Sequence, residues 1–122
     1  GVIGIGVDLG GRRRIRNKLA RTPTMVEKLF TAGERAYAEA ANDPTERYAA
    51  RFAAKEAVMK ALGVGLGAVD WHDIEVVRTD RGAPELDVSG RAGELAAHAG
   101  VTRWLLTMTH TTTVAEAIAV AL

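Results

Sequence analysis

The sequence predicts an α+β fold in which an antiparallel sheet packs against one long central helix. Three features predict it: a β-branched opening, a helix-length run in the middle of the chain, and alternating apolar segments toward its end. Strands joined by short turns pair antiparallel, and a long helix buries its apolar side against such a sheet. We expect a single domain over residues 1–122, because a chain of this length forms one core.

The opening is predicted to be a strand followed by a basic helix. Residues 2–8, VIGIGVD, are apolar and β-branched, which is typical of a buried strand. The pair Gly10–Gly11 should end this strand. Ile15 and Leu19 have the spacing of one helix face, so segment 12–21 is expected to be a short helix with a narrow apolar side. Its charged residues are all cations: Arg12, Arg13, Arg14, Arg16, Lys18 and Arg21.

Capping signals predict three more helices. A capping-box pattern precedes two short ones, expected over residues 25–29 and 32–41. The capping pairs are Thr24 with Glu27 and Thr31 with Glu34. The best-defined helix runs over residues 44–62, since Asp43 suits its N-cap and Gly63 suits its C-terminal cap. Because its many alanines let neighbouring backbone approach closely, we expect this helix to form the centre of the core.

The second half of the chain is predicted to be mostly strands. Residues 74–78 and 85–88 flank an R-G-A-P turn and form a hairpin by composition. A short helix is expected over residues 90–99. Residues 103–109 and 114–122 alternate in side-chain type across a short turn, which predicts a second antiparallel pair.

Composition narrows the class of protein. Hydrophobic residues make up 48% and charged residues 25%, as in ordinary soluble globular proteins. A net charge of +1 identifies no partner, and the absence of cysteine excludes disulfides, thiolate metal sites and thiol nucleophiles. No apolar run reaches the roughly 18 residues that span a bilayer. We therefore expect a cytoplasmic protein with no membrane partner.

The middle helix carries the strongest chemical signal. In RFAAKEAVMKALG at 51–63, Glu56 and Lys60 share a face. A carboxylate beside cations suits a metal-bridged polyphosphate, because the carboxylate holds a hard cation and the cations hold phosphate oxygens. Asp8, at the end of the first strand, is a candidate second metal ligand; a solvated ion pair on the helix is the alternative interpretation. Lys55 lies about 100° round the helix from Glu56, so we expect it to reach solvent or a neighbouring subunit.

Several segments, taken in order, resemble the holo-acyl-carrier-protein synthases, the small bacterial type of 4′-phosphopantetheinyl transferase. They are GIGVDL at 4–9, RRRIR at 12–16, FTAGERAYAEA at 30–40, ARFAAKEAVMKALGVG at 50–65, WHDIEVVRTDRGAPELDVSGRAGELA at 71–96 and LLTMTHTTT at 105–113. The F-x-x-K-E-x-x-x-K-A string from Phe52 to Ala61 is the most specific of them. The resemblance covers nearly the whole chain and implies the 4′-phosphopantetheinyl transferase fold.

The resemblance also implies an activity. Such an enzyme uses Mg²⁺ to move the 4′-phosphopantetheine group of coenzyme A onto a serine of an apo acyl carrier protein, and it releases 3′,5′-ADP. The reaction supports fatty acid or polyketide biosynthesis. The family commonly works as a homotrimer with active sites where subunits meet, and no nucleic acid is expected as a partner. The carrier protein served, the acceptance of acylated coenzyme A, and the choice between a stand-alone protein and a domain excised from a larger synthase stay open.

The family's functional residues have matching positions here. Asp8 and Glu56 are expected to hold Mg²⁺ and, with Lys60, to form the catalytic group. The residues expected to contact coenzyme A are Arg51, Lys60, Gly63, His110 and Thr111. Of these, the arginine and the histidine are expected at the 3′-phosphate, while Arg14 and Arg21 are expected to contact an acidic helix of the carrier protein. The general base is open between either carboxylate and a metal-bound water; we favour the water, held by Glu56.

Two other interpretations compete with this one. Segment 12–21 could serve a nucleic-acid-binding module, but the chain is nearly neutral and has no aromatic stacking platform beside that segment. A structural subunit without activity is the other, motivated by two of three departures from the family pattern, those at Gly11 and Thr112. Gly11 replaces a usual acidic residue, Thr112 stands where an acidic partner for the histidine is common, and Glu116 interrupts a normally apolar last strand.

Overall fold

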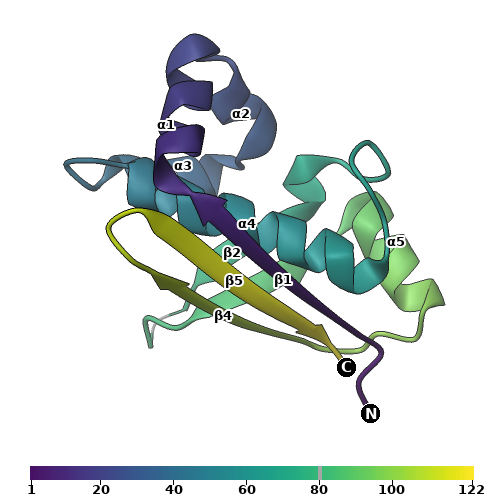
Figure 1. The fold of residues 1–122 in the computed structure, drawn as a ribbon. Coiled ribbons are helices and arrows are strands. Elements are labelled where there is room, and N and C mark those ends of the chain that lie inside the picture. The colour runs from purple at the N-terminus through teal and green to yellow at the C-terminus, as the bar shows by residue number, and fades with distance from the viewer. Residues whose placement is uncertain (80) are drawn as a thin grey trace.

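The computed structural model describes residues 1–79 and 81–122 and has an α+β architecture (Figure 1). Its elements are β1 Gly4–Gly11, α1 Arg12–Arg21, α2 Met25–Leu29, α3 Ala32–Glu39, α4 Thr45–Leu62, the 3-10 helix η1 Trp71–Asp73, β2 Ile74–Arg78, β3 Pro84–Val88, α5 Gly90–His98, β4 Trp104–His110 and β5 Val114–Ala121. Helix α4 crosses the middle of the molecule, with an antiparallel sheet of order β1-β5-β4 on one side and the hairpin β2–β3 as a second sheet. The predicted fold class is confirmed, and each predicted helix and strand is present.

The contact between β1 and α4 is made by backbone rather than by side chains. A Cβ atom built on Gly6 would overlap the carbonyl oxygen of Ala57, and one built on Gly4 would overlap that of Ala61. Only glycine fits at these two positions, because the obstacle is helix backbone that cannot rotate away. Strand β5 packs on the same helix through small side chains, the buried Ala115, Ala117, Ala119 and Ala121.

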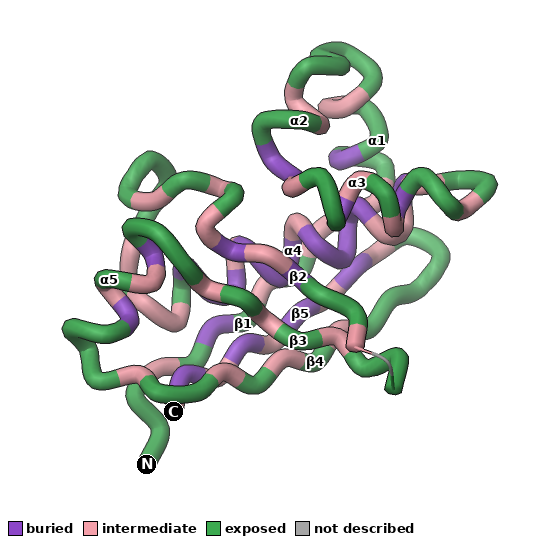
Figure 2. Tube along the Cα trace, turned by 180° about the vertical axis from the view of Figure 1, so that it is seen from behind, coloured by how far each residue is buried: buried purple, intermediate pink, exposed green. Residues whose placement is uncertain are grey.

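Most buried residues lie at this contact between α4 and the sheet. The buried stretches of the chain run along α4 and the inner side of the sheet, while α1 and the outer loops are mostly exposed (Figure 2). A second cluster, in which Phe30 and Tyr48 pack with ring centroids 4.6 Å apart, joins the short helices to α4. Within the described residues, no helix is both long enough and apolar enough to cross a membrane.

The outer face of the three-stranded sheet is apolar and uncovered. Ile5 is 66% exposed, Leu9 is 67% exposed and Leu105 is 42% exposed. Successive residues of a strand alternate between faces, so these side chains point away from α4 while their neighbours point toward it. Exposed apolar side chains grouped on one sheet face are typical of surfaces that contact another molecule.

The end of β1 differs from the prediction. Gly10 pairs with Ala115 and Gly11 pairs with Val114, so the strand continues through both glycines and α1 begins at the next residue. A glycine pair tends locally to end a strand, but here its pairing with β5 keeps both glycines in the sheet. That partner lies about a hundred residues further along the chain, beyond the reach of a local pattern.

One of the two predicted capping boxes is wrong. Thr24 makes no capping hydrogen bond with its side chain. The other box is confirmed, since the Glu34 amide donates to Thr31 Oγ1 at 3.2 Å and the Thr31 amide donates to Glu34 Oε1 at 3.0 Å. At the start of α4, Asp43 Oδ1 accepts the Thr45 amide at 3.0 Å, and at its end Gly63 has the predicted left-handed conformation.

Candidate active site

The backbone contact of β1 with α4 brings three of the predicted residues together. Asp8 lies on the same side of β1 as the two packed glycines, and it therefore faces the helix. Lys60 Nζ lies 3.0 Å from Asp8 Oδ1 and also donates to the carbonyl oxygen of Val7 at 3.0 Å. Glu56, one turn earlier on α4, lines the same pocket as Asp8. In the part of the chain that the structure describes, Lys60 pairs with Asp8 and not with Glu56.

The pocket has a volume of about 260 Å³ and a mixed lining. Two carboxylates, Asp8 and Glu56, lie on one side, and Arg14 and Lys18 of α1 supply cations. Its apolar lining includes Phe52, Ile15 and Leu66. A site of this size with few charged groups of both signs suits the phosphate end of a larger ligand.

Electrostatics couples the two carboxylates. Burial raises the pKa of Glu56, and the nearby charge of Asp8 raises it further, while Lys60 and the α1 cations oppose the shift. A cation bound between the two carboxylates would offset the repulsion that raises the pKa of Glu56. Among the described residues, no third Asp, Glu, His or Cys completes a protein-only metal cage. Two carboxylates with open positions for water and phosphate fit the ligand preference of Mg²⁺.

A second pocket, of about 320 Å³, lies around Arg51. Arg51 is only 3% exposed, and its Nε and Nη2 atoms have no hydrogen-bond partner among the described residues. Three guanidinium groups gather on the ring of Tyr37, with Cζ–centroid distances of 4.1 Å for Arg47, 4.3 Å for Arg51 and 5.1 Å for Arg78. Burial lowers the pKa of Arg51, because the charged guanidinium is less well solvated there than in water. A buried guanidinium with unused donors suits a phosphate group.

Sequence reasoning missed most of this second pocket. Arg47 precedes Arg51 by one helical turn, which was a usable signal for a shared face. Tyr37 comes from α3 and Arg78 from the end of β2, and no spacing in the sequence links either of them to α4.

His110 lines the second pocket and has a carboxylate partner. Its Nε2 atom lies 2.8 Å from Glu46 Oε1, and Glu46 also faces Arg12 at 3.9 Å. The acidic partner that Thr112 does not supply therefore comes from the first turn of α4. Thr111 Oγ1 accepts the amides of two later turn residues, Thr113 and Val114, and so closes the β4–β5 turn.

The two pockets lie on different sides of α4. They share no lining residue. Arg51 and Glu56 point in directions about 140° apart on a helix of 3.6 residues per turn. Gly63 ends α4 beyond Lys60 and lines neither pocket. Within one chain, the structure thus brings Asp8, Glu56 and Lys60 together but leaves Arg51 and His110 on a separate surface.

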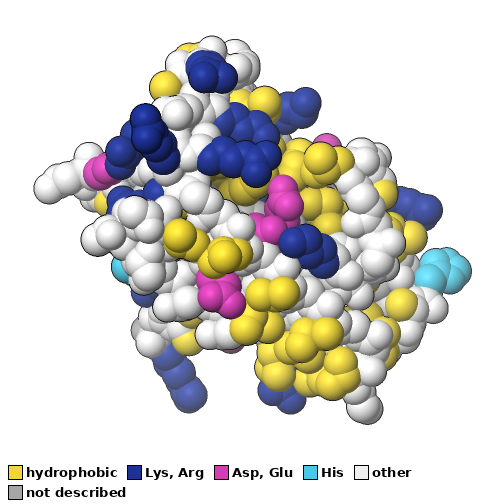
Figure 3. Space-filling model, in the orientation of Figure 1, with side chains coloured by type: hydrophobic (Ala, Val, Ile, Leu, Met, Phe, Trp, Pro, Cys, Tyr) yellow, Lys and Arg dark blue, Asp and Glu magenta, His cyan; other side chains and the backbone are white. Residues whose placement is uncertain are grey.

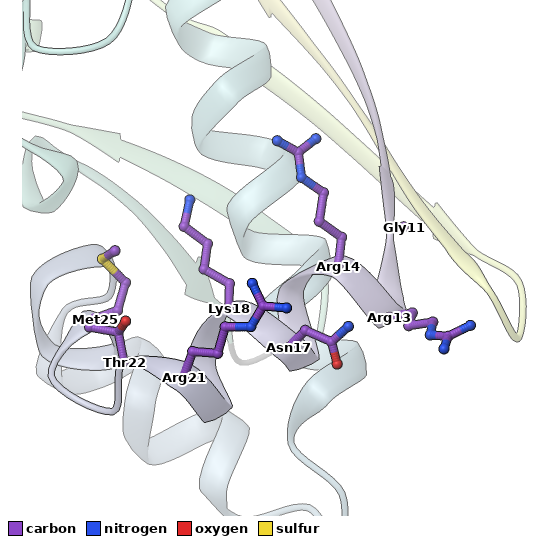
Figure 4. Close-up of a pocket in the computed structure, with 8 residues that line it drawn as sticks. All are labelled: Gly11, Arg13, Arg14, Asn17, Lys18, Arg21, Thr22 and Met25. Atoms are coloured by element: carbon purple, nitrogen blue, oxygen red, sulfur yellow. The ribbon is translucent and has the colours of Figure 1, made fainter.

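The cations of α1 form a basic surface beside the first pocket. Lys and Arg side chains gather over the α1 end of the molecule, with acidic side chains below them and hydrophobic patches over the strands (Figure 3). Arg14 and Lys18 extend to the same side of α1, toward α4, whereas Arg13 extends the other way (Figure 4). A shallow surface pocket is lined by Arg13, Arg14, Asn17, Lys18, Arg21, Thr22 and Met25. Arg14 and Lys18 also line the pocket of the two carboxylates.

Lys55 does not reach solvent or a surface, contrary to the prediction. Its side chain is completely buried, and Nζ lies 2.7 Å from Glu34 Oε1. It also donates to the carbonyl oxygens of Trp71, at 3.0 Å, and Ile74. Burial lowers the pKa of Lys55, and the charge of Glu34 partly restores it. The residue next to Glu56 is therefore a structural tie between α3, α4 and the start of β2.

Comparison with known proteins agrees with this arrangement. The sequence profile of the 4'-phosphopantetheinyl transferase superfamily matches residues 4–119. A holo-[acyl-carrier-protein] synthase of Frankia casuarinae is 47% identical over 120 residues, covering 98% of this chain and 97% of that protein. One of Desulforudis audaxviator is 44% identical over 121 residues, covering 98% of this chain and 92% of that protein.

Solved structures show the same architecture. The holo-[acyl-carrier-protein] synthase of Neisseria meningitidis superposes with a TM-score of 0.90 at 29% identity, over 100% of this chain and 99% of that one. The Helicobacter pylori enzyme, in complex with coenzyme A, gives a TM-score of 0.85 at 26% identity, over 97% and 99% of the two chains. The chain therefore belongs to the holo-[acyl-carrier-protein] synthases of the 4'-phosphopantetheinyl transferase superfamily.

Proposed function

We propose that this chain transfers the 4′-phosphopantetheine group of coenzyme A to a serine of an apo acyl carrier protein, releasing 3′,5′-ADP, in support of fatty acid biosynthesis. The observation that carries the proposal is the pocket that holds Asp8, Glu56 and Lys60 side by side under the basic surface of α1. Transfer of a phosphoryl-linked group needs positioning and charge stabilisation at the diphosphate, and two carboxylates with a lysine supply the groups for both.

In this proposal, Asp8 and Glu56 would hold Mg²⁺, and the bound cation would supply positive charge beside the diphosphate oxygens. Lys60 contacts the same diphosphate and stabilises the departing 3′,5′-ADP. The serine proton would pass through a water held by Glu56 and end on the departing 3′,5′-ADP or in solvent, so that the water relays the proton and does not keep it. Glu56 is suited to hold that water because it faces the pocket and is only partly buried.

The 3′-phosphate of coenzyme A is assigned to the second pocket. Arg51 offers two unused donors there, and Arg47, Arg78 and His110 add positive charge or donors around it. Gly63 and Thr111 are proposed as further contacts to the donor. The Thr111 amide already donates to the Val114 carbonyl oxygen at 2.8 Å, so its hydroxyl, which accepts two turn amides, is the group proposed to donate to the ligand.

A homotrimer would join the two half-sites. The two pockets of one chain lie on different sides of α4 and share no lining residue, so we propose that coenzyme A spans pockets of two neighbouring copies. The exposed apolar face of the β1-β5-β4 sheet supplies a surface for a second copy. Each complete site would then take Asp8, Glu56 and Lys60 from one copy and Arg51 and His110 from the next.

Mixing two inactive variants tests this shared site. Arg51→Gln should lose donor binding and Glu56→Gln should lose transfer, yet a refolded mixture should regain activity, since some sites then combine two intact halves. A refolded sample of Glu56→Gln alone is the control. Mixed trimers seen by native mass spectrometry without any regained activity would contradict the shared site.

The carrier protein is proposed to dock on the basic surface of α1. Arg14 and Arg21 line the shallow pocket there, and Arg14 also reaches the catalytic pocket. A surface with this charge attracts an acidic helix by long-range steering and places its serine beside the diphosphate.

The direct test is intact-mass spectrometry of an apo acyl carrier protein incubated with this chain, coenzyme A and Mg²⁺. The carrier should gain one phosphopantetheine, and a chelator should prevent the gain. Tight binding of coenzyme A without transfer to any of several carriers would instead support a structural subunit without activity.

A further inference from the structure

The exposed lysine of the catalytic pocket already neutralises a proposed metal ligand. Lys60 Nζ contacts Asp8 Oδ1 and the Val7 carbonyl oxygen, each at 3.0 Å. The Lys60 side chain is 54% exposed and the Asp8 side chain is 12% exposed. The ammonium group therefore lies on the carboxylate that a divalent cation would use.

We propose that Lys60 is an exchangeable counter-ion: it occupies Asp8 in the absence of metal, and Mg²⁺ displaces it toward the donor diphosphate. This inference rests on the proposed function, because it takes Asp8 and Glu56 as the metal ligands. It assigns Lys60 two successive partners, a carboxylate of its own chain and then a phosphate of the donor.

Electrostatic repulsion favours the exchange. A lysine cation and a divalent cation repel one another strongly at contact distance, so both do not stay on one carboxylate oxygen at full strength. The lysine is able to leave, since it has a flexible stem and a largely exposed head. The cations of α1 are not in this position: Lys18 lines the same pocket, but its Nζ lies over the Phe52 ring, 5.3 Å from the centroid.

Metal and donor then bind cooperatively. Mg²⁺ must release Lys60 from Asp8, and the donor phosphate gives the released ammonium a new partner. Each ligand therefore strengthens the other, and the coupling is reciprocal for the two binding equilibria.

Calorimetric titration of Mg²⁺ into the metal-free protein tests the exchange without any turnover. Lys60→Met should bind Mg²⁺ about five- to tenfold more tightly than the wild type, because a competing cation is removed, while its transfer rate falls. Lys18→Met is the matched control, since it removes one charge from the same pocket without touching Asp8. Its Mg²⁺ affinity should change by less than about twofold.

A second titration measures the coupling. Saturating coenzyme A, without carrier protein, should raise the Mg²⁺ affinity of the wild type by a larger factor than that of Lys60→Met. The exchange is overturned if Lys60→Met binds Mg²⁺ no more tightly than the wild type, or if Lys18→Met gains as much as Lys60→Met. If the wild type modifies no carrier protein, the proposed function is contradicted. The comparison of Mg²⁺ affinities still tests the exchange in that case, because it does not depend on turnover.

Discussion

Two lysines of helix α4 pair with carboxylates, and their surroundings differ completely. Lys55 and Glu34 are both 0% exposed and lie 2.7 Å apart, whereas Lys60 is 54% exposed and Asp8 is 12% exposed at 3.0 Å. The chemistry of the two pairs is the same. The comparison teaches that burial separates them, because a desolvated pair is costly to break and a solvated pair exchanges partners readily.

The largest effect is expected from breaking the buried pair. Lys55→Met should reduce the free energy of unfolding by about 3–5 kcal/mol, because it leaves the Glu34 charge buried without its partner. Urea denaturation followed by circular dichroism measures it. Combining Lys55→Met with Glu34→Gln should recover part of the lost free energy of unfolding. If Lys55→Met alone loses less than about 1 kcal/mol, the buried pair contributes no more to stability than an exposed one.

Next comes the carboxylate beside the exposed pair. Glu56→Gln should reduce transfer by at least about 100-fold, because a proposed metal ligand is lost, while the protein stays folded. Intact-mass kinetics and circular dichroism measure the two properties. Glu94→Gln, on the exposed surface of α5, is the control and should transfer normally. Near-normal turnover of Glu56→Gln would remove this residue from the metal site.

The same variant carries a pH-dependent prediction. Because the pKa of Glu56 is raised, the folded protein holds a proton there more tightly than the unfolded chain does. Stability is therefore lost as pH rises from the ordinary pKa through the raised one, and Glu56→Gln escapes this loss. Its melting temperature should exceed that of the wild type at about pH 8 and match it at about pH 4. A gain that is equal at both pH values would contradict the shift.

The α1 cations that belong to neither lysine–carboxylate pair should affect the rate at which the carrier protein binds, and not the stability of the fold. Reversing Arg14 and Arg21 to Glu should raise the KM for the carrier protein by about tenfold or more and the KM for coenzyme A by much less, and the effect on the carrier should shrink as salt is added. Arg16→Glu is the control, since Arg16 already pairs with Asp43 at 3.2 Å. Equal losses for both substrates would indicate misfolding instead of lost docking.

The smallest effect is expected from breaking the exposed pair. Lys60→Met should change the free energy of unfolding by less than about 1 kcal/mol, because a solvated pair contributes little to stability. Thermal denaturation measures it beside Lys55→Met. A loss as large as that of Lys55→Met would show that Lys60 is a structural residue and would remove the contrast between the two pairs.

Local signals predicted nearly all of the fold. Capping residues and helical spacing gave α4 within one residue at its start, and alternation gave the two C-terminal strands. The prediction was wrong at Gly10–Gly11, where β5 supplies a ladder that no nearby residue announces. It was also wrong for Lys55, because the burial of that lysine depends on Glu34 from another helix.

Some residues of the candidate site could also be predicted from the sequence, and others could not. Glu56 and Lys60 follow from helical spacing, and Asp8 was a candidate from its place on the first strand, to which the resemblance added support. The cluster of Arg47, Arg51 and Arg78 on Tyr37 joins three separate elements, so only the folded chain brings it together. Glu46, the carboxylate partner of His110, was hidden for the same reason.

The direct backbone contact of β1 with α4 has a consequence for ion choice. No side chain separates strand from helix at Gly4 and Gly6, so the spacing between Asp8 and Glu56 is set by main-chain atoms. Mg²⁺ binds at about 2.0–2.1 Å with near-ideal geometry, whereas Ca²⁺ takes longer and more variable bonds. Because main-chain atoms fix how closely β1 approaches α4, we expect the site to discriminate between Mg²⁺ and Ca²⁺ by ion size more than by ligand charge.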